Sequence, residues 1–386
     1  TFFCSVDDLQ KMARFKNRNY GLREESPSEM MEEEDPQTVE EDDNEEEAEN
    51  SDGSEDSGGN TSHPLGDGSD SESSDEIEAM QPLQMYFPPS EYKKKIKIST
   101  RCYIAGALET LLSDLNPPLT KRERSWFETH PQFKHILHML RDKNHKLQGM
   151  WMLLLRTACT EKEKEAWFVV NGVPIRYSIK EHALISGLDC HNYPVEFAGS
   201  GSQMGKMDFV DKYFKKGSKI RYQDVKAKLL EMGAARDRLN MAVLFFLSSI
   251  IKGLVKTGKE APSVDPFLLR AVNDLELCRT FPWGRLSFDH TLEQIAHTMN
   301  HFGGFVKENV KNPVLWPISG FCIPLELLAF EAIAPLRMKF RVPVPGADEG
   351  CPRMCRSKFT SSEMKGFPFE QINAELGTTK VCLIVG

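Results

Sequence analysis

The chain has 386 residues, of which 40% are hydrophobic, and its 48 basic and 57 acidic residues give a formal net charge of −9. This length and hydrophobic content allow a folded core, while nine cysteines without regular spacing exclude a small disulfide-stapled scaffold and favour a reducing cytosolic or nuclear compartment. The charge is unevenly distributed, because 24 acidic residues and no Lys or Arg lie between Glu24 and Glu78, and the remaining 33 acidic and 48 basic residues carry +15.

The first 80 residues divide into two segments by composition. Residues 1–23 form a short basic segment, which can hold a short helix and shows no apolar stretch typical of a signal peptide. Residues 24–80 form an acidic, low-complexity arm that we expect to be disordered, because it has too little apolar surface to offset the loss of chain entropy. Ser69 and Ser73 each precede a Glu by three residues, a pattern favoured by acid-directed kinases, although a solvating spacer is the simpler interpretation.

From residue 81 to residue 386 the composition is that of a folded domain. The stretch "FKHILHMLRD" places Phe133, Ile136, Leu137 and Leu140 on one helical stripe. The stretch "GMWMLLLRTA" predicts a second helix that is apolar on most sides, so we expect it near the centre of the domain.

The passage "WFVVNGVPIRYSIKEHALISGLDC", from Trp167 to Cys190, begins with the signals of a β-hairpin. Asn171 and Gly172 lie between two apolar runs, and this dipeptide predicts a two-residue hairpin turn. Pro174 has no N–H to donate to a neighbouring strand, so we expect the second strand to lie at an edge or to be irregular.

The same passage continues with the signals of a capped helix. Ser178 and Glu181 form an S-x-x-E capping box. Gly187 suits the left-handed position after the helix, and Leu188 can pack back onto its last turn. These signals concern backbone conformation, so the passage is interpreted as scaffold rather than as a reactive centre.

The rest of the chain is predicted to be mostly helical. The expected helices cover 222–232, 235–255, a segment that begins at Pro266, a segment from Ser287 or Asp289 to Gly303–Gly304, and a segment between Pro324 and Pro335. The second of these contains the longest apolar run, which is too short to span a bilayer and is expected to be a buried helix. We therefore predict a mainly α-helical domain with one short β-hairpin, preceded by a disordered acidic N-terminal arm.

The passage from Trp167 to Cys190 resembles the signature of the plant family known as domain of unknown function nineteen-eighty-five. The resemblance continues through "FPWGRLSFDHTL" and "GFCIPLELLAFEAIAPLR" and covers roughly residues 93–386. The residues that match the family motif, taken as fold markers, are Trp167, Asn171, Gly172, Pro174, Arg176, Ser178, Glu181, Gly187 and Leu188. His182 stands where an aromatic such as Phe is expected, which predicts a position at the edge of the core.

The resemblance implies a gene carried by, or derived from, a Mutator-like transposable element. It also implies that a SUMO-specific cysteine protease domain commonly follows this one, and it implies no activity for the domain itself. Such a protease needs a His, an Asp and a Cys that precedes Gly. Cys190, Cys322 and Cys351 are not followed by Gly, so we expect no catalytic residue in this chain.

Two groups of residues have side chains that can bind a metal, but a simpler interpretation is favoured for each. Cys351 and Cys355 form one pair, which Cys322 and Cys382 would complete to a four-ligand zinc site only by a coincidence of the fold. The second group lies on one helical face and consists of His135, His138, Asp142 and His145. An amphipathic helix needs a polar face in any case, so we interpret this group as a solvated surface. We predict no metal and no cofactor.

A nucleotide-binding loop is also not supported. The stretch "GSGSQMGKM", Gly199–Met207, has Ser200 where a phosphate-binding loop needs Gly, and Met207 where it needs Ser or Thr. We interpret it as a flexible loop.

A basic segment that follows is the better candidate for a binding site. Between Lys206 and Lys228 there are eight Lys or Arg and three Asp, with three aromatic residues interleaved: Tyr213, Phe214 and Tyr222. Basic side chains neutralise phosphates and aromatic rings stack on unpaired bases, although the aromatics can equally be core contacts. The residues predicted to contact a polyanion are Lys215, Lys216, Lys219 and Arg221.

We therefore predict a non-catalytic binding or adaptor module of a transposon-derived plant protein, which contacts a polyanion such as nucleic acid. The alternative is an accessory N-terminal region of a SUMO-specific cysteine protease whose catalytic domain is absent from this chain. The partner is a protein or a nucleic acid and not a membrane, and the acidic arm can contact the basic body within the same chain. "KKKIK", Lys93–Lys97, is a candidate nuclear-import signal, so we expect a nuclear location, with the cytoplasm as the alternative.

Overall fold

The computed structural model describes residues 84–377 except for 101–103, 140–146, 161–163, 201–203, 254–260, 308–313 and 361–366. The predicted basic segment 1–23 and acidic arm 24–80 lie outside the described residues, and so do Asp142, His145 and Cys382.

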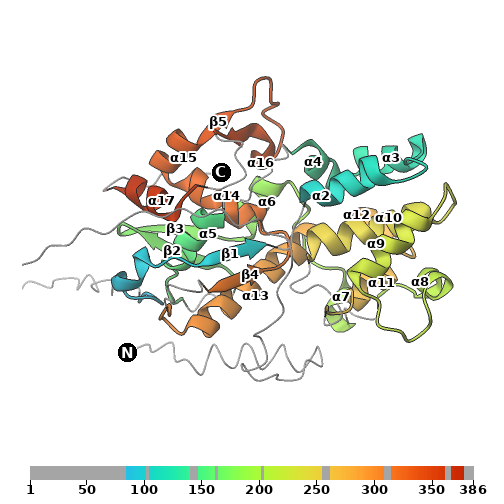
Figure 1. Ribbon diagram of the computed structural model, residues 1–386, viewed down its shortest axis with the longest axis horizontal. Helices are drawn as coiled ribbons and strands as arrows, with labels where there is room; N and C mark the ends of the chain where they lie inside the picture. The colour runs from blue at the N-terminus through green and yellow to red at the C-terminus, as the bar shows by residue number, and fades with distance from the viewer. Residues whose placement is uncertain are drawn as a thin grey trace, which may run out of the picture. The chain divides into compact units, whose positions relative to one another are not determined.

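The described part of the chain is mainly α-helical, as predicted (Figure 1). Its helices are α2 (Ile104–Glu109), α3 (Lys121–Glu128), α4 (Phe133–His138), α5 (Leu147–Leu154), α6 (Ile179–Ser186), α7 (Val195–Ser200), α8 (Asp208–Tyr213), α9 (Tyr222–Glu231), α10 (Arg238–Phe246), α11 (Pro266–Ala271), α12 (Leu275–Thr280), α13 (Trp283–Phe302), α14 (Ile323–Ala332), α15 (Ala334–Phe340), α16 (Arg353–Arg356) and α17 (Phe369–Leu376). A 3₁₀ helix covers Pro89–Lys93, and π-helical turns at Thr110–Asp114 and Leu247–Ile251 extend α2 and α10.

Three two-stranded sheets accompany the helices in the described residues. The predicted hairpin is present, with β2 (Ala166–Val170) antiparallel to β3 (Val173–Tyr177). Two further pairs were not predicted, namely β1 (Lys97–Thr100) parallel to β4 (Leu315–Ile318), and β5 (Arg341–Pro343) antiparallel to β6 (Ser357–Phe359). These strands have three or four residues each, so the alternation of apolar and polar residues along them is too short to recognise.

The hairpin has the edge that its proline requires. Within the described sheets β3 pairs with β2 alone, so Pro174 sits opposite Val169 without having to donate to a further strand. The other side of β2 is bridged by Thr157, and the Val169 N–H donates to the Arg156 carbonyl at 2.9 Å. The edge position predicted for the second strand is therefore confirmed.

Helices α5 and α14 form the centre of the domain and pack against each other (Figure 1). In α5 all residues but Gln148 are buried, and in α14 all but Glu331. A Cβ on Gly149 would lie 2.5 Å from Cε2 of Phe330, so the two helices approach as closely as they do because residue 149 has no side chain. The prediction that "GMWMLLLRTA" is a central helix is confirmed.

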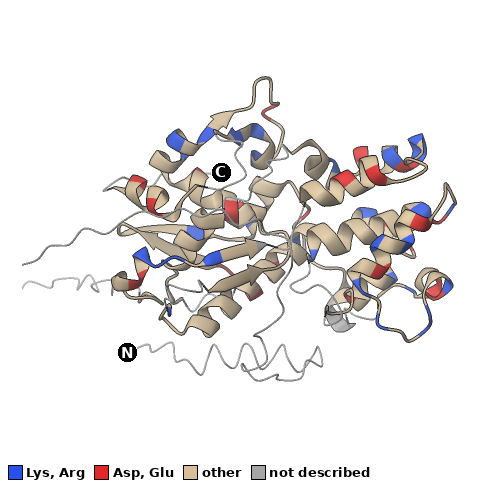
Figure 2. Cartoon of the chain, in the orientation of Figure 1, with Lys and Arg blue, Asp and Glu red and all other residues tan. Residues whose placement is uncertain are grey.

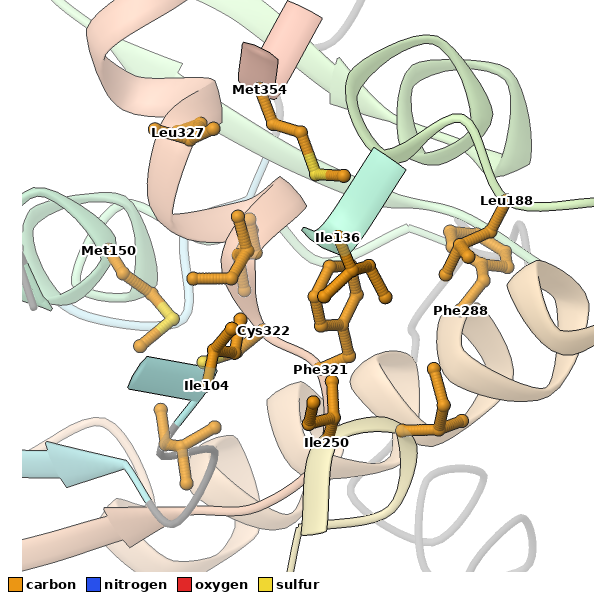
Figure 3. Close-up of a cluster of buried hydrophobic side chains, with 14 of the residues drawn as sticks. Ile104, Ile136, Met150, Leu188, Ile250, Phe288, Phe321, Cys322, Leu327 and Met354 are labelled. Atoms are coloured by element: carbon orange, nitrogen blue, oxygen red, sulfur yellow. The ribbon is translucent and has the colours of Figure 1, made fainter. Parts of the chain in front are cut away.

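The surrounding helices contribute side chains to the same core. Figure 3 shows Ile136 of α4, Met150 of α5, Phe288 of α13, Leu327 of α14 and Met354 of α16 converging on one cluster. The apolar run in α10 is part of this core, because every residue from 241 to 247 is 0% exposed. The predicted buried helix is confirmed, and no helix in the described residues has the length and hydrophobicity needed to cross a membrane.

Three predicted helices have wrong boundaries. The helix expected at 235–255 covers residues 238–251, in α10 and its π-helical turn. The helix expected to start at Ser287 or Asp289 starts four residues or more earlier, at Trp283, directly after Pro282, and Ser287 is buried in its interior. The segment that begins at Pro266 is two helices, because the Asp274 side chain accepts from the N–H groups of Glu276 and Leu277 and so starts α12. A proline precedes the start of α13, and an aspartate with helix-capping bonds starts α12.

One buried ion pair connects α3 to α10. The Arg238 side chain is 0% exposed and donates to both carboxylate oxygens of Glu123, at 2.6 and 2.9 Å, and to the carbonyls of Pro117 and Pro118. The same carboxylate accepts from the Thr120 N–H at 2.7 Å in the capping box of α3. Desolvation acts to raise the pKa of Glu123, but the hydrogen bonds from Arg238 and Thr120 outweigh it and hold the pKa below its ordinary value.

We predict that Glu123→Gln lowers the free energy of unfolding by about 3–5 kcal/mol, because it leaves the buried Arg238 charge without its carboxylate. Glu128→Gln on the same helix is the matched control, since Glu128 pairs with Arg124 at the surface and its loss is expected to cost less than about 1 kcal/mol. Urea unfolding of the full chain measures both. An equal decrease in the free energy of unfolding for both variants would contradict a larger contribution from the buried pair than from the surface pair.

Candidate functional site

The hairpin turn has the conformation that its sequence predicts. Asn171 has φ 51° and Gly172 has φ 79°, the two positive values that a type I′ turn requires. The Asn171 side-chain amide also donates to the carbonyl of Leu376 at 3.1 Å, so the turn holds the end of α17. Asn171 therefore has two roles, because it adopts the backbone conformation of the turn and its side chain contacts α17.

The predicted capping box of α6 is present and is almost fully buried. The Ser178 N–H donates to Glu181 Oε2 at 2.8 Å, and the Ser178 hydroxyl accepts from the Lys180 N–H at 3.2 Å. Arg176 donates to the other oxygen of Glu181 at 3.2 Å. Desolvation acts to raise the pKa of Glu181, but the hydrogen bonds from Ser178 and Arg176 outweigh it and hold the pKa below its ordinary value. The carboxylate therefore stays charged as a structural acceptor.

The end of α6 also follows its sequence signals. Gly187 is left-handed, with φ 69°, and a Cβ there would collide with Pro352 Cγ and lie 3.0 Å from His135 Cδ2. Leu188 is 3% exposed, and Trp167 is half-buried with its indole N–H donating to Glu165. All these motif residues shape or pack the backbone.

His182 lies in the core, so its predicted position at the core's edge is wrong. Its side chain is 0% exposed, its Nδ1 lies 2.7 Å from the Tyr177 hydroxyl, and its ring packs edge-on against Phe288. Burial lowers the pKa of His182 to about 3, so the ring is neutral and fills the place of an aromatic. A histidine replaces the expected aromatic because Tyr177 supplies a polar partner, which the sequence pattern could not show.

Cys190 and His191 do not form a nucleophile and base with one another or with His182. Burial raises the pKa of the Cys190 thiol to about 12, and in the described residues neither imidazole hydrogen-bonds its sulfur. The His191 side chain is 92% exposed and pairs with Asp189 at 2.5 Å. A thiol with this pKa carries almost no thiolate at neutral pH, so the geometry does not activate it.

The candidate metal ligands do not come together in the described residues, and the described part of the candidate phosphate loop packs against the fold. Within the parts of the chain that are described, no three His, Cys, Asp or Glu side chains group around a possible ion. Cys355 instead contacts the His135 carbonyl, and α4 ends at His138, before Asp142 and His145. In the predicted flexible loop, Gly205 lies against the Arg270 carbonyl, to which the Lys206 N–H donates at 3.4 Å.

A histidine pair on α13 was not predicted. His297 and His301 are exposed one turn apart and both contact Trp316. Their spacing, H-x₃-H within a helix, is the signal that could have identified them.

The predicted import signal "KKKIK" is part of the fold. Lys94 pairs with Glu91 at 3.0 Å and donates to the Val306 carbonyl, Lys95 pairs with Glu370, and Ile96 is 4% exposed. These contacts hold the segment against the domain surface.

The predicted polyanion contacts lie on the loop between α8 and α9, where Figure 2 shows basic residues following one another. Lys215, Lys216 and Lys219 are exposed, and Arg221 is partly exposed at the start of α9. Lys216 has a carboxylate, that of Asp211, only at 4.0 Å, and in the described residues Lys215 and Lys219 have none within that distance. The structure thus brings the three lysines together on one exposed loop.

The aromatics of the same segment point into the fold. Tyr222 stacks on Phe245 of α10 with 5.5 Å between ring centroids, and the Tyr213 hydroxyl donates to Asp237 at 2.9 Å. Phe214 packs against the core. The sequence left open whether these aromatic rings stack on unpaired bases or contact the core, and the structure supports contacts with the core.

Comparison with known proteins finds a match to a family model. Residues 154–294 match the model of a family described as "Domain of unknown function (DUF1985)", which confirms the predicted resemblance over that range. The chain is also 36% identical over 313 residues to the uncharacterized Arabidopsis thaliana protein At3g43530, covering 81% of this chain and 36% of that protein. The chain therefore spans about a third of the length of this relative. No solved structure matches this chain.

We predict that Gly187→Ala destabilises the chain more than Gly172→Ala. Both glycines have positive φ, so each alanine costs about 1–2 kcal/mol in backbone strain. Only at residue 187 does the added Cβ meet other side chains, which adds about 1–3 kcal/mol of overpacking, whereas residue 172 faces open space. Urea unfolding of the two variants measures the difference, and equal destabilisation would contradict the close contact with Pro352.

Proposed function

We propose that this chain, whose residues 154–294 match the DUF1985 family model, is a non-catalytic binding or adaptor module that contacts a polyanion such as nucleic acid. The family description carries no activity, so the proposal rests on the residues of this chain. A transposon-derived origin belongs to the same proposal and is supported by the sequence resemblance alone.

The exposed lysines of the α8–α9 loop carry the proposal. Between residues 206 and 228 the eight Lys and Arg exceed the three Asp by five charges. Lys215 and Lys219 are exposed without a carboxylate nearby in the described residues, so their charges are available to an external anion. Such groups displace counterions from a phosphate backbone, and the affinity that results falls steeply with salt concentration.

The orientation of the aromatics limits the kind of contact that we propose. Tyr222 and Phe214 are committed to the core, so they do not offer free faces on which unpaired bases could stack. The lysines alone contact phosphates and read no base edges. We therefore propose contact with the backbone of the polyanion, without sequence specificity.

The proposal of a non-catalytic role is supported by the chemistry of the family motif. Cys190 has a raised pKa, His182 is a neutral buried ring, and Glu181 is held by the capping box. Each of these potentially reactive groups has a structural partner or environment that removes its reactivity at neutral pH.

The second candidate function is an accessory region of a SUMO-specific cysteine protease. The match leaves 64% of the Arabidopsis relative outside its range, which leaves room there for another domain. The gene sequence that follows residue 386 distinguishes the candidates: a His–Asp–Cys protease segment supports the accessory role, and a different domain removes it.

We predict that changing Lys215, Lys216 and Lys219 together to Glu weakens binding of the full chain to duplex DNA and to RNA. Because each lysine that contacts a phosphate contributes about 1 to the slope of log K against log salt, the slope should fall by up to about 3. Fluorescence anisotropy across salt concentrations measures both quantities.

The control changes three exposed basic residues elsewhere, Lys121, Arg122 and Lys180, to Glu, and so alters the net charge by the same amount. It should bind almost as the unmodified chain does. No salt-dependent binding by the unmodified chain, or an equal loss in both variants, would refute the proposed surface.

We also propose a nuclear location, with the cytoplasm as the alternative. Because Lys94, Lys95 and Ile96 are engaged by the fold, we predict that Lys93→Ala has little effect on the location of a fluorescently tagged full chain. Microscopy of plant cells checks both points, and a tagged chain confined to the cytoplasm would refute the nuclear proposal.

A further inference from the structure

His297 and His301 lie on successive turns of one face of α13. Both side chains are exposed, and the spacing of four residues places their Cβ atoms about 5–6 Å apart on a helix. The helix itself is 20 residues long and ends at the left-handed Gly303, so the pair lies on its well-formed last two turns.

Trp316 of β4 holds both rings. The indole lies with its centroid 5.2 Å from that of His297 and 4.1 Å from that of His301, and each imidazole is inclined by 27° to it. Trp316 is 3% exposed, and its N–H donates to the Thr298 hydroxyl at 3.0 Å. The indole is therefore a fixed platform, and two imidazoles stacked on it lose less freedom when they bind a ligand than two free side chains would.

The two rings lie near each other, because both stack on the same indole. A neutral imidazole presents a nitrogen lone pair, the form that binds metal ions.

We propose that His297 and His301 form a two-histidine site for a late first-row divalent cation, with Cu²⁺ bound more tightly than Ni²⁺ or Zn²⁺. Imidazole nitrogen suits these ions, and the order follows their general affinity for nitrogen ligands. No third His, Cys, Asp or Glu joins the pair among the described residues, so water completes the coordination and the ion exchanges readily. The site is independent of the lysine loop and of the proposed polyanion contact.

The test titrates the full chain with CuSO₄ while tryptophan fluorescence is recorded, and with ZnCl₂ in a calorimeter. Bound Cu²⁺ beside Trp316 quenches its indole. Because the second histidine binds an ion already held by the first, removing one ligand should weaken binding by about 100-fold. His297→Gln and His301→Gln should each show this loss.

Two further variants separate the explanations. His191→Gln removes an exposed histidine that pairs with Asp189 and should leave the affinity unchanged. Trp316→Phe keeps a ring beneath the pair, so it should retain Zn²⁺ binding in the calorimeter while losing most of the Cu²⁺ quenching. Unaltered affinity in His297→Gln and His301→Gln, or absence of binding by the unmodified chain, overturns the proposal.

Discussion

The close approach of α5 to α14 is the constraint on which the described fold depends. Gly149 permits the contact with Phe330, and both helices are covered along nearly their whole length. Two helices that are apolar all round need protein on every side, because exposed apolar area costs about 25 cal/mol per Å². The hairpin, α6, α13, α15, α16 and α17 are arranged around this pair and supply that cover.

This arrangement explains why polar side chains in the passage from Trp167 to Cys190 take structural partners. The passage lies between the central helices and the surrounding ones, where polar groups must find partners when water is excluded. Ser178 and Glu181 satisfy the start of α6, and Nδ1 of His182 meets the Tyr177 hydroxyl, whereas the buried Nε2 of His182 has no hydrogen-bond partner among the described residues. The same demand is met at Arg238, whose charge is balanced by Glu123 and two carbonyls. Side chains that could do chemistry in water are here engaged in holding backbone.

The surface offers two features of different chemistry. The α8–α9 loop presents ammonium groups on flexible side chains, suited to a diffuse anion such as a phosphate backbone. The exposed face of α13 presents two imidazoles that stack on an indole, suited to a compact cation. Neither feature includes residues of α5 or α14, so the exposed lysines and histidines can change without loss of the contact between these two helices.

Local signals in the sequence were sufficient to predict the hairpin turn, the capping box, the end of α6 and the central helices, because each depends on residues within about one turn of one another. The lysine loop was also visible as a run of charge, but whether Tyr222 and Phe214 faced solvent depended on α10 and the core, far along the chain. The burial of His182, the pairing of β1 with β4 and the stacking of Trp316 beneath His297 and His301 likewise join distant segments. By itself the sequence determined the local backbone and the distribution of charge, and only the tertiary structure decided which side chains meet, because such contacts depend on how distant elements pack.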